Sequence, residues 1–304
     1  MEHSYKEREK YKIQFDLVNI PSKGIFYPNK PTSIPVRYLT TVEENILTTP
    51  SLLENKEAIT TVLKLVVMDE TISINDLLLC DRDAIVLFLR STAYGDSFPI
   101  FFTCPKCNKE SEVNFTLSSF GVKDIKIQPD DNGFYKAQLP KSKKSVLYRH
   151  LTVKDEELMF DADTFTMQLE KQIISIDGVE SREYVKKFVK NMPISDSSFL
   201  RKYINETEPG FDKTVELECE FCKNTSKTEL QLDYKLLKMD ANYRKNIMEE
   251  IFLITYYSQG GITRNDVMDM TVSERRWHIQ RISEEIDKKN QAEEKAIQKS
   301  KSKR

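Results

Sequence analysis

The residues most able to do chemistry in this sequence are four cysteines, arranged as two Cys-x-x-Cys pairs: Cys104 with Cys107, and Cys219 with Cys222. The two-residue spacing lets both sulfurs of a tight turn face one ion, so two such turns supply four thiolates. Four thiolates around Zn²⁺ make a closed structural site, with no open position for water or substrate. The sequence therefore predicts one structural zinc ion bound by these four cysteines.

Three other uses of the cysteines are open: two disulfides, two redox-active dithiols, or unpaired surface thiols. A redox-active Cys-x-x-Cys is expected in a βαβ setting, which the flanking sequence does not provide. The N-terminus is charged and has no apolar core, so we expect no signal peptide and a reducing compartment, where thiols bind metal. The fifth cysteine, Cys80, stands in an apolar stretch, and we expect it to be a small buried residue.

Each cysteine pair lies between residues that alternate apolar and polar, which is the period of a half-buried strand. We therefore expect two antiparallel hairpins, at about 97–117 and 213–233, with a cysteine turn at each tip. Such turns need a residue that tolerates positive φ, and Asn108 and Asn224 are the candidates. The sequence between the hairpins, about 118–212, is then a long insertion. Because the cost of loop closure rises only logarithmically with length, we expect its two ends to lie side by side at the metal.

The chain as a whole predicts an α+β protein. Residues 1–96 combine a proline-rich extended arm with a helical subdomain, residues 97–233 form a split zinc-ribbon domain with an α/β insertion, and residues 234–304 form a helical segment with a charged tail. The expected architecture is a helical body with short antiparallel β-hairpins forming a split zinc ribbon, a long insertion between the two Cys-x-x-Cys hairpins, and a helical C-terminus.

Local patterns predict where individual elements begin and end. Asn132-Gly133 predicts a tight hairpin turn, and an apolar stripe from Leu158 to Ile173 predicts one long helix. Residues 247–257 are apolar on nearly every side, so we expect that helix to be buried in the protein or in a partner. Capping boxes pair a threonine with an acid three residues later at a helix start. They are Thr41 with Glu44, Thr152 with Asp155, and Thr271 with Glu274.

No catalytic arrangement rises above chance. The three histidines are scattered, and the eight glycines form neither a P-loop nor a GxGxxG motif. The longest apolar runs are about half a dozen residues, too short to cross a bilayer. We therefore expect no enzyme, no small-molecule substrate and no transmembrane segment.

The charge pattern makes nucleic acid an unlikely partner. The formal net charge is −2, and acidic residues that would repel phosphate flank both cysteine pairs. These residues are Glu110, Glu112, Glu216, Glu218 and Glu220. A zinc-ribbon nucleic-acid-binding protein, such as a transcription or RNA-processing factor, is still the rival function, because zinc ribbons often serve it.

The C-terminal segment carries a candidate protein-binding group. Trp277 is the only tryptophan, and it follows Arg275 and Arg276. Tryptophan and arginine are enriched among interface hot spots, so these three residues are predicted to contact a partner. The alternative is that Trp277 packs on the body while the arginines hydrogen-bond carbonyls at a helix end.

Four stretches of the chain resemble a family of bacteriophage proteins. They are PSKGIFYP followed by VRYLTTVEENIL; DRDAIVLFLRSTAYGDSFPIFFTCPKC; SFLRKYINETEPGFDKTVELECEFCKN; and the terminal helix with RRW. Together they resemble the baseplate hub proteins of T4-like contractile-tailed phages. The resemblance implies a structural or assembly component of the tail baseplate, made in the host cytoplasm and carried in the virion. It also implies other tail proteins as partners and no catalytic activity. A transient assembly factor, absent from the mature virion, is the alternative within this class.

Overall fold

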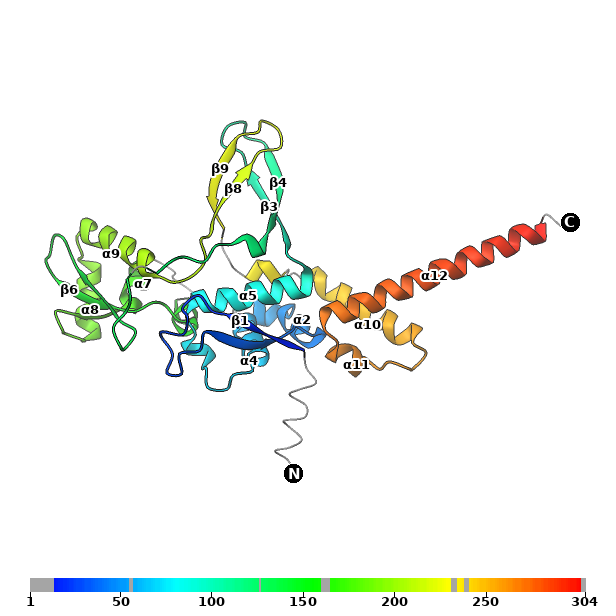
Figure 1. The fold of residues 1–304 in the computed structure, drawn as a ribbon, viewed down its shortest axis with the longest axis horizontal. Coiled ribbons are helices and arrows are strands. Elements are labelled where there is room, and N and C mark those ends of the chain that lie inside the picture. Colours follow the sequence, from blue (N-terminus) through cyan, green and yellow to red (C-terminus); the bar gives the residue numbers. More distant parts are fainter. Residues whose placement is uncertain are drawn as a thin grey trace, which may run out of the picture.

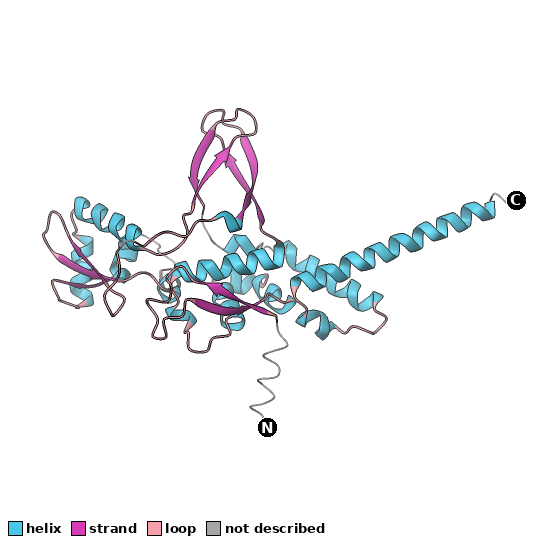
Figure 2. Ribbon diagram, in the orientation of Figure 1, coloured by secondary structure: helices cyan, strands magenta, loops and turns pink. Residues whose placement is uncertain are grey.

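The computed structural model describes residues 14–54, 57–125, 127–159, 165–230, 234–237 and 241–301. Helices form a central body from which two hairpins rise together, with an α/β segment at one side and a long helix projecting from the other (Figure 1). Among the described residues the strands are confined to four small sheets (Figure 2). The first thirteen residues of the predicted N-terminal arm lie outside this part of the chain.

The N-terminal part forms the body. The predicted extended arm is an antiparallel hairpin of β1 (Phe15–Asn19) and β2 (Ser33–Arg37). Alternate residues of a strand face the same side, so β2 buries Ile34 and Val36 against the helices. These helices are α2 (Thr41–Leu47), α3 (Pro50–Glu54), α4 (Glu57–Val66), the 3₁₀ turn η1 (Ile74–Asp76) and α5 (Leu79–Tyr94).

The stretch PSKGIFYP forms the loop between β1 and β2, and Asp81 of α5 anchors it. The Asp81 carboxylate accepts hydrogen bonds from the Ser22 amide at 3.0 Å and from the Tyr27 hydroxyl at 2.5 Å. Burial raises the pKa of Asp81. Gly24 has φ +73°, and a Cβ atom there would lie 2.3 Å from the carbonyl oxygen of Pro31. Only glycine therefore fits this turn.

The helix α2 begins one residue earlier than predicted. Thr40 caps it, because Glu43 accepts hydrogen bonds from the Thr40 amide at 2.9 Å and from its hydroxyl at 2.7 Å. The sequence Thr-Thr-Val-Glu-Glu holds two overlapping capping boxes, and the predicted one, Thr41 with Glu44, is wrong because Glu44 is buried and bonded elsewhere. Two predicted boxes are confirmed: Thr152 with Asp155, and Thr271 with Glu274.

After α5 come the two cysteine hairpins and the segment between them. The first hairpin comprises β3 (Ser97–Thr103) and β4 (Glu110–Thr116), followed by η2 (Leu117–Ser119); the second comprises β8 (Thr214–Glu218) and β9 (Thr225–Glu229). The ends of the intervening segment lie side by side, as predicted, but at the foot of the hairpins, where β4 ends and β8 begins, rather than at the cysteine turns. The Lys123 amide donates to the Gly210 carbonyl at 2.8 Å, and the Asp212 amide donates to the Gly121 carbonyl at 2.7 Å.

The segment between these ends has a hydrophobic core of its own. Its three-stranded antiparallel sheet packs with short helices around buried residues that include Tyr148, Ile173 and Leu200. Its elements are β5 (Tyr135–Gln138), β6 (Ser145–Tyr148), α6 (Val153–Leu158), α7 (Phe165–Gln172), β7 (Ile173–Ile176), α8 (Arg182–Lys190) and α9 (Ile194–Thr207).

Two sequence predictions in this segment are wrong. The predicted single helix is two helices: α6 ends at Leu158, with Met159 as its C-cap, and α7 ends before Ile173, which starts β7. Pairing of β7 with β6 overrides the helical stripe at Ile173. Part of the stripe, residues 160–164, lies outside the described residues. Asn132-Gly133 makes a turn but joins no hairpin. There the Asp130 side chain accepts the amides of Asn132 at 2.9 Å and Phe134 at 2.8 Å, which closes a loop on itself.

The C-terminal part begins after the turn η3 (Tyr234–Leu237) and forms α10 (Ala241–Tyr257), α11 (Arg264–Asp269) and α12 (Val272–Lys301). Its small core joins Ile247, Ile251 and Ile254 to Val267. Of the two predicted ways to bury this helix, burial on all sides within the protein is wrong, and burial against a partner stays a prediction. Phe252 and Tyr256 are 61% and 65% exposed, because only one face of α10 packs inward. Among the described residues, no helix is long and apolar enough to cross a membrane.

A buried histidine lies where the α/β segment meets the body. His150 is 2% exposed and lies against the aromatic rings of Phe26 and Tyr135, with centroid separations of 5.9 and 4.9 Å. Its Nε2 atom lies 3.1 Å from the carbonyl oxygen of Thr207. Burial lowers the pKa of His150 to about 4, so the imidazole is neutral in the folded protein at neutral pH.

This burial predicts a specific loss of stability in mild acid. The unfolded chain takes up the proton below pH about 6.5, whereas the folded chain resists it until about pH 4. The free energy of unfolding should therefore fall by about 2 kcal/mol between pH 7 and pH 5 because of this residue. His150→Gln keeps a donor for the Thr207 carbonyl but does not titrate. Urea unfolding at both pH values should show a shallower loss in that variant; equal losses would contradict the prediction.

Candidate metal centre

The cysteine pairs lie in the turns of the two hairpins, β3–β4 and β8–β9, which rise together from the body (Figure 1). Cross-strand pairs join Thr103 to Glu110 in the first hairpin and Glu218 to Thr225 in the second, so each strand pair ends just before its cysteine turn. The two hairpins are separate two-stranded sheets with no strand ladder between them. Ile100 of the first hairpin and Val215 and Leu217 of the second are buried in the same hydrophobic core as the body.

The two turns have the same backbone hydrogen bonds. In the first, the Cys104 amide donates to the Lys109 carbonyl and the Asn108 amide donates to the Cys104 carbonyl, both at 2.9 Å. In the second, the Cys219 amide donates to Asn224 and the Lys223 amide donates to Cys219, both at 3.0 Å. This repetition gives the pairs equivalent local conformations.

The positive-φ positions follow from that equivalence. Asn108 has φ +54°, as predicted. In the second turn the residue is Lys223, with φ +56°, rather than Asn224. The equivalent position is the residue directly after the second cysteine of each pair, so the prediction for Asn224 is wrong by one residue. Lysine accepts the left-handed conformation here although asparagine would adopt it at a lower energy cost.

The four sulfurs converge. All four Sγ atoms lie within 4.8 Å of one another, and the distances Cys104–Cys222 and Cys107–Cys219 are both 3.6 Å. Zn–S bonds of about 2.3 Å in a tetrahedron place sulfurs about 3.8 Å apart, whereas a disulfide needs about 2.0 Å. Cys104 and Cys219 are buried, and Cys107 and Cys222 are half-buried. The arrangement is therefore compatible with zinc.

Local donors stabilise negative charge on the sulfurs. The Ser111 hydroxyl, 3.4 Å from the Cys219 sulfur, and backbone amides of the turn lower the pKa of Cys219 to about 6. The amide of Cys107 lowers the pKa of Cys104 in the same way. At Cys222 the amide of Asn224 lowers the pKa, but burial and the neighbouring sulfurs raise it to about 11. Crowded thiolates repel one another, so a bound cation would compensate their charge.

The surroundings of the cluster are acidic and polar. All five glutamates that flank the cysteines are exposed; Glu216 pairs with Lys227 at 3.1 Å, and Glu218 pairs with Lys223 at 3.3 Å. The Lys109 ammonium lies 4.7 Å from the centroid of the Phe221 ring, which joins the two turns. Cys80 is buried beside Asp81 and takes no part in the cluster.

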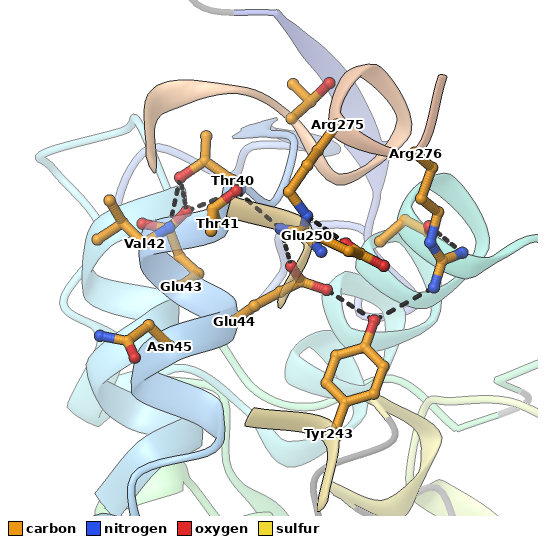
Figure 3. Close-up of polar contacts among 12 residues, drawn as sticks. Thr40, Thr41, Val42, Glu43, Glu44, Asn45, Tyr243, Glu250, Arg275 and Arg276 are labelled. Carbon is orange, nitrogen blue, oxygen red and sulfur yellow. Dashed lines mark hydrogen bonds and ion pairs between the residues drawn. The ribbon is translucent and has the colours of Figure 1, made fainter. Parts of the chain in front are cut away.

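The predicted partner-binding residues have three different positions. Arg275 is fully buried, which corrects the prediction that it contacts a partner. Its guanidinium forms an ion pair with Glu44, donates to the Thr41 hydroxyl at 2.7 Å, and lies 2.6 Å from a carboxylate oxygen of Glu250 (Figure 3). Arg275 thereby joins α12 to α2 and α10.

Arg276 is half-buried and belongs to the same cluster. It donates to the Tyr243 hydroxyl at 3.2 Å and lies 5.0 Å from the centroid of the Tyr94 ring. Both tyrosine hydroxyls donate to Glu44, at 2.7 Å from Tyr94 and at 2.9 Å from Tyr243, whose bond Figure 3 shows. A buried carboxylate is costly unless it is paired and hydrogen-bonded, and Glu44 has both kinds of partner.

Trp277 differs from the two arginines because it is 58% exposed. It follows them on α12, and its ring contacts only the neighbouring His278 among the aromatic residues described. Of the three predicted residues, Trp277 is thus the one that offers a large accessible surface.

Sequence reasoning missed the residues that hold the C-terminal helices to the body: Glu44, Tyr94, Tyr243 and Glu250. A signal for Glu44 was present in the doubled capping box, since one helix start can use only one of two successive glutamates. The tyrosines and Glu250 carry no such signal, because their contacts join elements that are distant in sequence. The thiol partner Ser111 was also missed for that reason.

Comparison with known proteins adds the family. The family model for the T4 bacteriophage base plate protein matches residues 12–233. No curated protein and no solved structure matches the chain. The matched residues include the body, both cysteine hairpins and the segment between them, and they end before α10. Because the match covers well over half of the 304 residues, the chain belongs to the T4 bacteriophage base plate protein family.

Proposed function

We propose that this protein is a hub component of the phage baseplate, which binds other tail proteins and carries a structural zinc ion. The family match over residues 12–233 carries this proposal. Membership gives the protein a structural or assembly role in the baseplate and a place in the virion tail. We add three proposals to what family membership gives: the position in the hub, the zinc ion, and assembly in the host cytoplasm.

The zinc proposal is supported by the donor set. Cys104, Cys107, Cys219 and Cys222 would hold the ion, and four sulfurs leave no position for water or substrate. When bound, the ion supplies charge compensation and a rigid link between two sheets that share no strand ladder. We therefore assign the centre an architectural role and no catalytic step.

The zinc content provides the first test. Purified protein should carry about one zinc ion per chain. Cys104→Ser or Cys219→Ser should lower the metal content and the melting temperature, since a loss of about 3 kcal/mol corresponds to roughly 5–10 °C in a chain of this size. Elemental analysis and calorimetry measure both quantities. Cys80→Ser is the matched control and should keep its zinc. Full thermal stability of the metal-free parent would refute an architectural role.

The second test asks where the protein resides. Mass spectrometry of purified virions and of isolated baseplates should detect the chain in both, at a fixed ratio to other baseplate proteins. Presence in assembly intermediates alone would favour a transient assembly factor over a resident hub component. For the rival function, titration with DNA should give only weak, non-specific binding, because exposed glutamates surround the ribbon. Sub-micromolar affinity at physiological salt, with the steep salt dependence of real phosphate contacts, would favour a nucleic-acid-binding protein.

The third test concerns the C-terminal part, where we propose that Trp277 contacts another tail protein. Trp277→Ala should leave zinc content and melting temperature unchanged but weaken co-purification with tail proteins by at least about tenfold, the scale of one hot-spot residue. Ile297→Ala, which changes another exposed apolar residue of α12, is the control and should bind as the parent does. If Trp277→Ala binds normally, the docking surface lies elsewhere.

A further inference from the structure

The sulfur positions carry a second chemical consequence. The contacts Cys104–Cys222 and Cys107–Cys219, each 3.6 Å, both run from one hairpin to the other. They share no cysteine, so two bonds could form at the same time. We propose that the cysteine centre is a site of oxidative modification, at which a peroxide converts the four thiols into these two disulfides between the hairpins.

Two of the sulfur–sulfur contacts between the hairpins are 3.6 Å, and the other sulfur pairs also lie within 4.8 Å, so the preference for pairing between hairpins rests on the loops that the bonds would close. Residues of both hairpins belong to one hydrophobic core, and the sulfurs at the two tips lie within 4.8 Å of one another. Each bond requires its sulfurs to approach from 3.6 Å to about 2.0 Å, and each proposed pair contains one half-buried cysteine at the tip. The proposed bonds span 118 and 112 residues. Cross-links over long loops restrict the unfolded chain far more than a bond within a four-residue turn.

The step balances in atoms and electrons. A thiolate attacks one peroxide oxygen, forming a sulfenic acid and releasing the other oxygen as water. The thiol opposite then displaces the sulfenic oxygen as a second water and forms the S–S bond. Two disulfides consume two peroxide molecules, which take up four electrons, and the four thiol protons end in water. The half-buried Cys107 and Cys222 are the more accessible sulfurs of the two pairs, and the step balances whichever sulfur of a pair reacts first.

The setting supplies a reason for such chemistry. A protein of the virion tail leaves the reducing cytoplasm when the particle is released, and disulfides persist in oxidising surroundings. Oxidation between the hairpins would keep the ribbon closed after its thiolates are lost as metal ligands. Disulfides within each turn would leave the two tips unconnected.

The test uses the full-length chain, folded, in a buffer without denaturant. The protein is treated with EDTA and hydrogen peroxide, blocked with N-ethylmaleimide, and digested without reduction by trypsin and a glutamate-specific protease. Cleavage after Lys106 separates Cys104 from Cys107, and cleavage after Glu220 separates Cys219 from Cys222. Mass spectrometry then distinguishes every pairing. We expect peptides joining Cys104 to Cys222 and Cys107 to Cys219. Bonds within the turns, the opposite cross-pairing, or sulfinic acids without disulfides would each overturn the proposal.

Electrophoresis gives an independent readout. Closing loops of more than a hundred residues should make the oxidised chain migrate faster in a non-reducing denaturing gel, and dithiothreitol should reverse the shift; bonds within the turns would leave migration unchanged. Cys80→Ser should behave as the parent. Zinc is measured before EDTA is added, so an absence of zinc would count against the proposed function while leaving the pairing test intact.

Discussion

The ion pair between Glu44 and Arg275 is the contact on which the relative placement of the helices depends. Neither side chain reaches solvent, so each charge must be compensated inside the protein. Arg275 meets the carboxylates of α2 and α10, and two tyrosines from α5 and α10 complete the hydrogen bonding of Glu44. Removal of one partner would leave a buried charge unpaired, which costs several kcal/mol. The cluster therefore fixes the C-terminal helices on the body. The body lies within residues 12–233, which the family model matches, whereas the C-terminal helices lie outside them.

The two cysteine hairpins illustrate how a long insertion can separate the halves of one small site. The insertion has its own core, and hydrogen bonds between residues 121–123 and 210–212 close it before the second hairpin begins. The second half of the ribbon thus starts from a position already fixed beside the first. The hydrogen bonds between the two ends of the insertion therefore offset most of the entropy cost of bringing the hairpins together. The cysteines then need to order only the turns at the hairpin tips.

The sequence was sufficient to predict features that arise from neighbouring residues. The hairpins follow from strand periodicity, the convergence of the cysteines follows from the paired spacing, and the caps at Thr152 and Thr271 follow from the box pattern. It failed where distant contacts decide the outcome. Ile173 lies in a strand because β7 pairs with β6. Arg275 is buried because its charge is compensated by Glu44, which is distant in the sequence. Nothing local to either residue encodes those neighbours.

The separation of the cysteine pairs also constrains the order of events during synthesis. At about 5–20 residues per second, a ribosome needs roughly 6 to 24 s to extend the chain over the 112 to 118 residues between the paired sulfurs. The first turn must therefore wait with two thiols while the insertion emerges and folds. A truncated chain that stops anywhere before residue 222 lacks at least one of the four cysteines of the cluster. The assembled cysteine cluster is thus a mark of translation beyond residue 222 and of an insertion that has folded so that the two hairpins lie together.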